Sequence, residues 1–158
     1  MHEPPGYDCP FCRLLRGVET ERNRLADVVW RDETTTAFVS PKWWPGNPGA
    51  AIVIPNRHVE NLYAIDDALL GDVYATAKRV ATAMRAAYGC MGTSTRQHNE
   101  PGGNQDVWHF HVHVFPRSED DGLYGRDGES RWVDASERGG YAERLRAALL
   151  ANRDRVAE

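Results

Sequence analysis

The 158-residue sequence has little lysine, only three cysteines and no long hydrophobic run. No apolar stretch approaches the about 18 residues that a membrane-spanning helix needs. The first six residues contain neither the basic segment nor the apolar segment of a secretory signal. We therefore expect a cytoplasmic protein that has no membrane partner.

The charge balance excludes another class of partner. The chain carries 19 basic and 23 acidic residues, a formal net charge of −4, and the acidic groups are spread along it. Proteins that bind nucleic acid without sequence preference need a basic excess, so we expect no nucleic-acid partner, although a small anion remains possible. All basic residues except Lys42 and Lys78 are arginine, which reflects either phosphate recognition or genomic codon usage.

Length and patterning predict a single α+β domain over residues 1–158. The clearest element is a helix over 66–88, where apolar residues recur three and four positions apart, with acidic residues at its start and Gly89 after its end. A second helix is expected over Gly140–Asn152, after an irregular acidic segment over 118–138. Short β-branched and aromatic runs predict strands of an antiparallel sheet. The expected strands are 28–31, 34–40, 50–54, 93–98 and 107–115.

The three cysteines are too few for a disulfide framework in a chain with no signal peptide. Cys9 and Cys12 form a Cys-x-x-Cys pair, for which metal binding, redox chemistry and coincidence are all open. Cys90 follows the long helix and is expected to be a small buried residue.

Histidine is concentrated in one expected strand. The run Val-Trp-His-Phe-His-Val-His-Val-Phe at 107–115 alternates with period two, so His109, His111 and His113 share one face, roughly 7 Å apart. Trp108 and the apolar residues that alternate with the histidines would face the core. Such imidazoles can bind a metal, transfer protons, or attack phosphorus or a carbonyl carbon.

The run at 109–115 resembles the His-φ-His-φ-His-φ-φ signature of the histidine triad (HIT) family. Residues 47–58 resemble the family's Pro-x-Gly-His-x-Leu-Val-Ile-Pro-x-x-His segment, and 98–105 resemble its Gly-Gln stretch. The resemblance covers about 9–117. Phe-Pro-Arg at 115–117 also resembles the diadenosine-polyphosphate hydrolase branch.

The resemblance implies a HIT-like fold, a homodimer and a nucleotide hydrolase. His111 would attack the α-phosphorus of a purine nucleotide conjugate, and water would release the nucleotide from the resulting nucleotidyl-histidine. His113 and Gln105 would contact the phosphate, and His109 completes the catalytic triad. Spacing favours His98 and residue type favours Asn99 at the family's nucleotide-binding Asn or Gln position. The positions implied for nucleotide binding are Phe38, Ser40, His98, Asn99, Asn104, Gln105, Asp106 and His113.

The same resemblance implies a zinc site. Family members with the N-terminal cysteine pair complete a structural zinc site with two histidines, which correspond to His58 and His109 here. Four protein ligands from Cys9, Cys12, His58 and His109 suit a closed structural zinc. Such a site would attach the N-terminal segment to the histidine strand.

The chain departs from the family pattern at three positions. Ala50 replaces a common histidine, Ser40 stands where an acidic or amide residue usually binds the ribose, and Asp106 replaces a phosphate-binding Ser or Thr. These departures leave open a nucleotide sensor with weak catalysis. A nucleotidyl transferase also stays open, because it shares the first half-reaction with a hydrolase.

Three other features have two interpretations each. Trp43 and Trp44 could stack on a base or form a hydrophobic plug, and Arg117 could bind a distal phosphate or form an ion pair. The acidic run at 119–121 is expected to be a solvated loop rather than a metal site.

Overall fold

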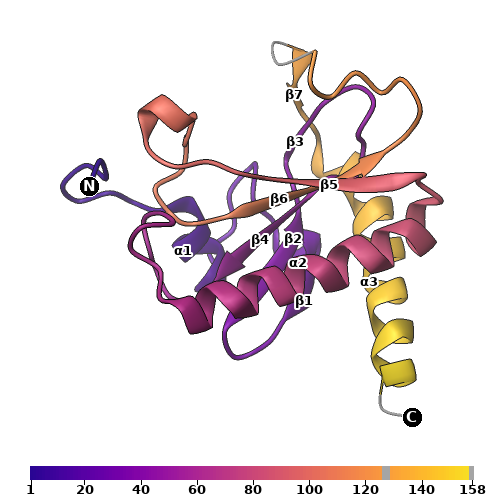
Figure 1. The fold of residues 1–158 in the computed structure, drawn as a ribbon, viewed down its shortest axis with the longest axis horizontal. Helices are drawn as coiled ribbons and strands as arrows, with labels where there is room; N and C mark the ends of the chain where they lie inside the picture. Colours follow the sequence, from indigo (N-terminus) through magenta and orange to yellow (C-terminus); the bar gives the residue numbers. More distant parts are fainter. Residues whose placement is uncertain (126–128, 157–158) are drawn as a thin grey trace.

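The computed structural model describes residues 1–125 and 129–156, and side chains only as far as 153. It confirms the predicted α+β fold, an antiparallel sheet covered by helices (Figure 1). In chain order the elements are α1 (Pro10–Leu15), η1 (Leu25–Asp27), β1 (Val28–Arg31), β2 (Thr35–Val39), β3 (Lys42–Trp43), β4 (Ala51–Pro55), α2 (Asp67–Tyr88), β5 (Gly92–Gln97), η2 (Pro101–Gly103), β6 (Val112–Arg117), β7 (Arg131–Trp132) and α3 (Ala135–Val156).

The main sheet has five strands in the order β1-β2-β4-β6-β5, and each neighbouring pair is antiparallel. His113 on β6 lies opposite Ile52 of β4 and Arg96 of β5, so strand pairing holds it on both sides. The short strands β3 and β7 pair with each other in a separate two-stranded sheet.

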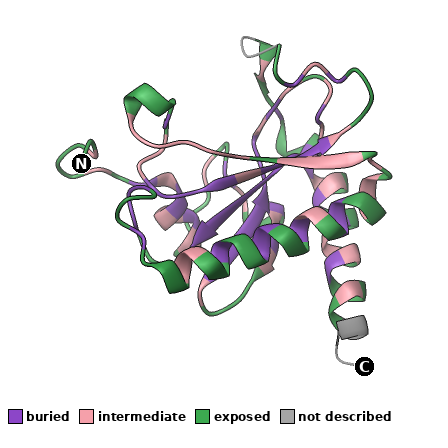
Figure 2. Cartoon of the chain, in the orientation of Figure 1, coloured by how far each residue is buried: buried purple, intermediate pink, exposed green. Residues whose placement is uncertain are grey.

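The inner strands β2 and β4 are buried along their length (Figure 2). The two faces of the main sheet carry different clusters of buried side chains. One face packs against α2 through a large cluster that includes Val53, Val80 and Val112. The other face carries a smaller cluster, in which Phe11 of α1 packs with Phe38 and Ile52. The histidines and the cysteine pair lie on the side of the smaller cluster, because His111 contacts Phe11.

The long helix follows its predicted boundaries. Asp66 is the N-cap, and its carboxylate accepts a hydrogen bond from the Leu69 amide at 3.0 Å. Gly89 ends the helix in the left-handed conformation, with a φ of 65°. Within the part of the chain that the structure describes, no helix is long and apolar enough to cross a membrane.

The predicted histidine strand is wrong at its N-terminal end, because β6 begins only at Val112. Before that point the backbone bonds to a loop, with the Phe110 amide donating to the Val59 carbonyl at 2.6 Å. Phe110 is buried in the core as expected. Trp108 is not in the core, because it is half-buried and stacks on His2.

The C-terminal helix begins five residues before the predicted start, at Ala135. The segment over 118–138 is less irregular than expected, since it also contains β7, and its residues 126–128 lie outside the described part. Asp121 is buried, which corrects the prediction of a fully solvated acidic run.

Trp43 is only 1% exposed and contacts Tyr141. Of its two interpretations, the structure therefore favours a hydrophobic plug over stacking on a base.

Candidate functional site

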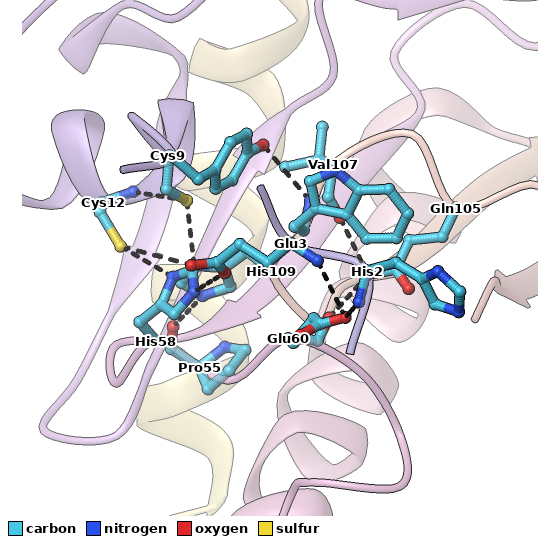
Figure 3. Close-up of polar contacts among 12 residues, drawn as sticks. His2, Glu3, Cys9, Cys12, Pro55, His58, Glu60, Gln105, Val107 and His109 are labelled. Atoms are coloured by element: carbon cyan, nitrogen blue, oxygen red, sulfur yellow. Dashed lines mark hydrogen bonds and ion pairs between the residues drawn. The ribbon is translucent and has the colours of Figure 1, made fainter. Parts of the chain in front are cut away.

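Four side chains from distant parts of the sequence converge beside α1 (Figure 3). Cys9 is the N-cap of α1, Cys12 lies in its first turn, His58 follows β4 and His109 precedes β6. One ligand atom from each residue lies within 4.8 Å of the other three. These are the four residues that the resemblance implies for zinc.

The distances within this group fit a tetrahedral metal site. Cys9 Sγ lies 3.4 Å from His109 Nδ1, and Cys12 Sγ lies 3.3 Å from His58 Nδ1 and 3.6 Å from His109 Nδ1. Zn–S bonds of about 2.3 Å and Zn–N bonds of about 2.0 Å place such atoms about 3.5 Å apart in a tetrahedron. The thiols and imidazoles are therefore already spaced for zinc.

Both imidazoles are oriented through the ring nitrogen that faces away from the thiols. His109 Nε2 donates to the Pro55 carbonyl at 2.9 Å, and His58 Nε2 donates to the Glu3 carboxylate at 2.6 Å. Because these oxygens only accept, each neutral ring keeps its lone pair on Nδ1, directed at the cysteines. Metal-binding histidines typically have such an outer partner.

The ionisation of the group also suits a metal. Burial lowers the pKa of His109 to about 4, so its ring is neutral and its Nδ1 lone pair is available at neutral pH. Burial raises the pKa of the Cys9 thiol to about 12. A bound cation would stabilise the thiolate that this environment otherwise disfavours, so the donor set fits zinc.

The tautomer of His111, two residues after His109, is set by a backbone hydrogen bond. Its Nδ1 donates to the His109 carbonyl at 2.7 Å, which leaves the lone pair on Nε2. Burial lowers the pKa of His111, which favours the neutral ring. The arrangement supplies an imidazole base or nucleophile that does not have to lose a proton first.

Two further histidines lie beside His111. The His113 ring centroid is 5.0 Å from that of His111 and 6.1 Å from that of His98. His98 Nδ1 donates to the Gly103 carbonyl at 2.8 Å, so its lone pair also lies on Nε2. Burial holds the pKa of His113 well below its usual value, so this ring is neutral.

His109 differs from the other catalytic candidates in its surroundings. Its ring is fully buried, Nδ1 faces the cysteines and Nε2 binds Pro55. No ring nitrogen of His109 remains to contact a nucleotide. It instead positions His111 through its backbone carbonyl.

Gln105 and Asn99 use their amides within the loop that precedes the histidines. Gln105 is buried, where it donates to the Glu60 and Val107 carbonyls at 2.6 and 3.0 Å and accepts from the Glu100 amide at 2.8 Å. Asn99 Oδ1 accepts from the Leu62 amide at 2.8 Å. These two side chains support the loop, whereas His98 is the one directed toward His113.

The remaining nucleotide-binding candidates fall into two groups. Phe38 is covered by Phe11, with ring centroids 5.4 Å apart, and the Ser40 hydroxyl donates to the Lys42 carbonyl at 3.0 Å. Both are therefore buried and engaged within the protein.

The other group is exposed. Asn104 ends η2 in the left-handed conformation, and Asp106 is exposed close enough to His111 for its charge to raise the pKa of that ring. These residues could meet a ligand without a rearrangement of the core.

Sequence reasoning missed two residues that build the site. Phe11 lies edge-on to His109 and His111, with centroid distances of 5.7 and 5.4 Å. Its place inside Cys-x-x-Cys is the only sequence signal for this contact. Glu3 had no signal at all, because 55 residues separate it from its partner His58.

Arg117, which could have bound a phosphate, forms an ion pair with Asp121 at 2.6 Å.

Comparisons with known proteins agree with this geometry. Residues 21–120 match the HIT domain family. Adenosine 5'-monophosphoramidase HNT1 of Saccharomyces cerevisiae is 32% identical over 78% of this chain and 73% of its own length. The asymmetrical bis(5'-nucleosyl)-tetraphosphatase of Schizosaccharomyces pombe is 28% identical over 61% of this chain and 52% of its own.

A solved structure agrees as well. The zinc-bound histidine triad family protein of Mycobacterium smegmatis superimposes with a TM-score of 0.76 at 25% identity, over 96% of this chain and 98% of its own. Motif, fold and site geometry lead to one conclusion: the chain belongs to the HIT family.

Proposed function

We propose that the protein is a hydrolase that cleaves purine nucleotide conjugates at the α-phosphate, through a nucleotidyl intermediate on His111. The observation that carries the proposal is the hydrogen bond from His111 Nδ1 to the His109 carbonyl, which leaves Nε2 unprotonated. A neutral imidazole held in this tautomer is ready to attack phosphorus.

The reaction has two displacements. The Nε2 lone pair of His111 forms a bond to the α-phosphorus while the bond to the leaving oxygen or nitrogen breaks, and the leaving group takes up a proton. Water then attacks the same phosphorus, the phosphorus–nitrogen bond breaks, and His111 returns to its neutral form. His113, whose ring lies beside that of His111, would donate a hydrogen bond to a phosphate oxygen.

Zinc would have a structural role in this proposal. When bound by Cys9, Cys12, His58 and His109, it would have four protein ligands and no open position for a substrate. It would fix His109, whose carbonyl sets the tautomer of His111. The metal would therefore support catalysis by holding the backbone of the histidine segment.

Two substrate classes are consistent with the relatives. One relative is named as an adenosine 5'-monophosphoramidase and another as a bis(5'-nucleosyl)-tetraphosphatase. Both nucleoside phosphoramidates and dinucleoside polyphosphates have an α-phosphate bonded to a leaving group. We further propose a cytoplasmic homodimer, with α2 and β5 at the interface.

The test is to incubate the protein with diadenosine tetraphosphate, adenosine phosphoramidate and a nucleotide sugar, and to identify the products by mass spectrometry. We expect adenosine monophosphate from at least one substrate and a loss of about 10³-fold or more in His111→Ala. His2→Ala is the matched control, because His2 is an exposed histidine whose ring lies against Trp108 and Glu100 rather than against the histidines at 111 and 113.

Three results would each contradict part of the proposal. Turnover that survives His111→Ala would exclude His111 as the nucleophile. Tight binding of adenosine monophosphate without turnover of any substrate would instead support a nucleotide sensor. Transfer of the nucleotide to an added alcohol in preference to water would identify a transferase.

A further inference from the structure

A groove lies between α2 and α3, over the end of β1. Its volume is about 670 Å³, within the range of small-molecule sites. One stripe of α2 supplies its first wall, one stripe of α3 supplies its second, and Trp30 of β1 lies between them. The lining residues are Trp30, Ala75, Lys78, Arg79, Thr82, Leu149, Asn152 and Arg153.

The groove is remote from the candidate catalytic site. Strands β2 and β4 separate β1 from β6, which carries His113. Trp30 lies opposite Ala37, whose side chain belongs to the core on the α2 face, whereas His111 contacts the cluster on the other face. A ligand in the groove would therefore not touch the histidines.

The charge of the groove is opposite to that of the whole chain. Lys78, Arg79 and Arg153 line it, and none of the eight lining residues is acidic, although the chain has a net charge of −4. Among the residues whose side chains are described, none forms an ion pair with any of the three. Three adjacent cations favour an anionic ligand.

Trp30 gives the groove a fixed aromatic surface. Its indole Nε1 donates to the Asp32 carboxylate at 2.9 Å, and the half-buried ring packs against the core. The guanidinium groups of Arg79 and Arg153 lie 5.4 and 5.8 Å from the ring centroid. An aromatic ligand could contact the indole while its anionic group reaches one of these cations.

The ends of the groove add hydrogen-bonding groups, since Thr82 and Asn152 also line it. Ala75 and Leu149 complete an apolar wall. The groove thus combines an aromatic surface, aliphatic contacts and converging cations. We propose that it binds a small organic anion that has a flat aromatic ring.

The test titrates the full-length protein with 2-naphthalenesulfonate and follows amide and indole resonances by NMR. We expect saturable shifts at Trp30 and along the facing stripes of α2 and α3. Arg79→Gln and Lys78→Gln should each weaken binding about fivefold, the effect of removing one partly screened charge contact. Arg85→Gln removes the same charge from an exposed position of α2 outside the groove, so its affinity should stay unchanged.

A second comparison tests the aromatic part. Hexanesulfonate, an aliphatic anion, should bind more weakly than 2-naphthalenesulfonate to the native protein, and Trp30→Leu should abolish that difference. Equal affinity of the two anions for the native protein would overturn the aromatic requirement.

Several outcomes would overturn the site itself. These are an equal loss of affinity in Arg85→Gln, shifts that map to His111 and His113, and the absence of saturable binding. Tighter binding of an acidic peptide to the same stripes would identify a protein-docking surface instead. None of these results depends on turnover, so they are independent of the proposed hydrolase activity.

Discussion

Single hydrogen bonds determine what the histidines can do. His109 directs Nδ1 at the cysteines. His111, two residues later, uses Nδ1 for a backbone hydrogen bond and keeps its lone pair on Nε2. In each case a carbonyl oxygen fixes the proton on the opposite nitrogen. In the proposed function, the same residue type would thus serve metal binding at one position and nucleophilic chemistry at the other.

Glu3 is the residue whose contribution to the metal site can be isolated most cleanly. Its carboxylate orients His58 from outside the ligand set, and such outer partners typically change metal affinity by about 10- to 100-fold. We expect Glu3→Gln to weaken zinc binding by about tenfold or more, measured by competition with a chromophoric chelator.

The control for this measurement is Asp8→Asn. Asp8 is an acidic residue of the same N-terminal segment, and its carboxylate forms an exposed ion pair with Arg13 rather than contacting a metal-site histidine. Its zinc affinity should match that of the native protein. Equal zinc affinities for Glu3→Gln and the native protein would contradict a role for Glu3.

At the scale of elements, the loop that connects β3 to β4 is held against both long helices at Gly49. This residue has a φ of 83°, and a Cβ built on it would lie 2.4 Å from Tyr141 Cδ1 and 2.9 Å from Tyr88 Cε2. Only glycine fits both the backbone conformation and the space. The loop therefore depends on this close approach to keep its place beside the core.

We expect Gly49→Ala to lower the free energy of unfolding by about 2 kcal/mol or more, because the strained φ and the steric overlap act together. Gly71→Ala should have the opposite sign. Gly71 lies inside α2 with no heavy atom within 4 Å of an added Cβ, so alanine should stabilise the helix by about 0.5–1 kcal/mol. Urea denaturation of the two variants measures both effects, and a neutral Gly49→Ala would refute the argument.

The elements also show what the sequence could predict. α2 was predictable because its periodic apolar face and both caps are local in sequence. The start of β6 was not, because alternation alone does not reveal that Phe110 bonds to Val59 instead of a neighbouring strand. The predicted start of the C-terminal helix at Gly140 was wrong, because α3 begins at Ala135 and runs through both glycines at 139–140.

The same distinction applies to the site. The spacing of His109, His111 and His113 indicated a functional cluster, whereas Cys-x-x-Cys alone left metal binding, redox chemistry and coincidence open until the family resemblance implied a zinc site. The outer contacts of Glu3 and Pro55 were not predictable, since they join residues about 55 positions apart. The groove beside Trp30 likewise exists only once two distant helices have packed.

At the scale of the whole molecule, α3 is joined to the first third of the chain by a buried ion pair. Arg138 Nη2 lies 2.8 Å from Asp27 Oδ2, and both side chains are nearly inaccessible to solvent. Arg138 also donates to the Val133 carbonyl. This contact explains why α3 begins before its paired glycines, because it holds the first turn of the helix against η1.

Removal of one partner should leave the other charge buried without compensation. We expect Arg138→Met to lower the free energy of unfolding by about 3–5 kcal/mol, measured by urea denaturation. Combined with Asp27→Asn, the cost should be about 1–3 kcal/mol less than the sum of the single changes, because the stranded carboxylate is then absent. Arg131→Met is the matched control, because Arg131 pairs with Glu137 at the surface and should contribute less than about 1 kcal/mol. If the two arginine variants lost the same stability, the Asp27 contact could not be what joins α3 to the rest of the molecule.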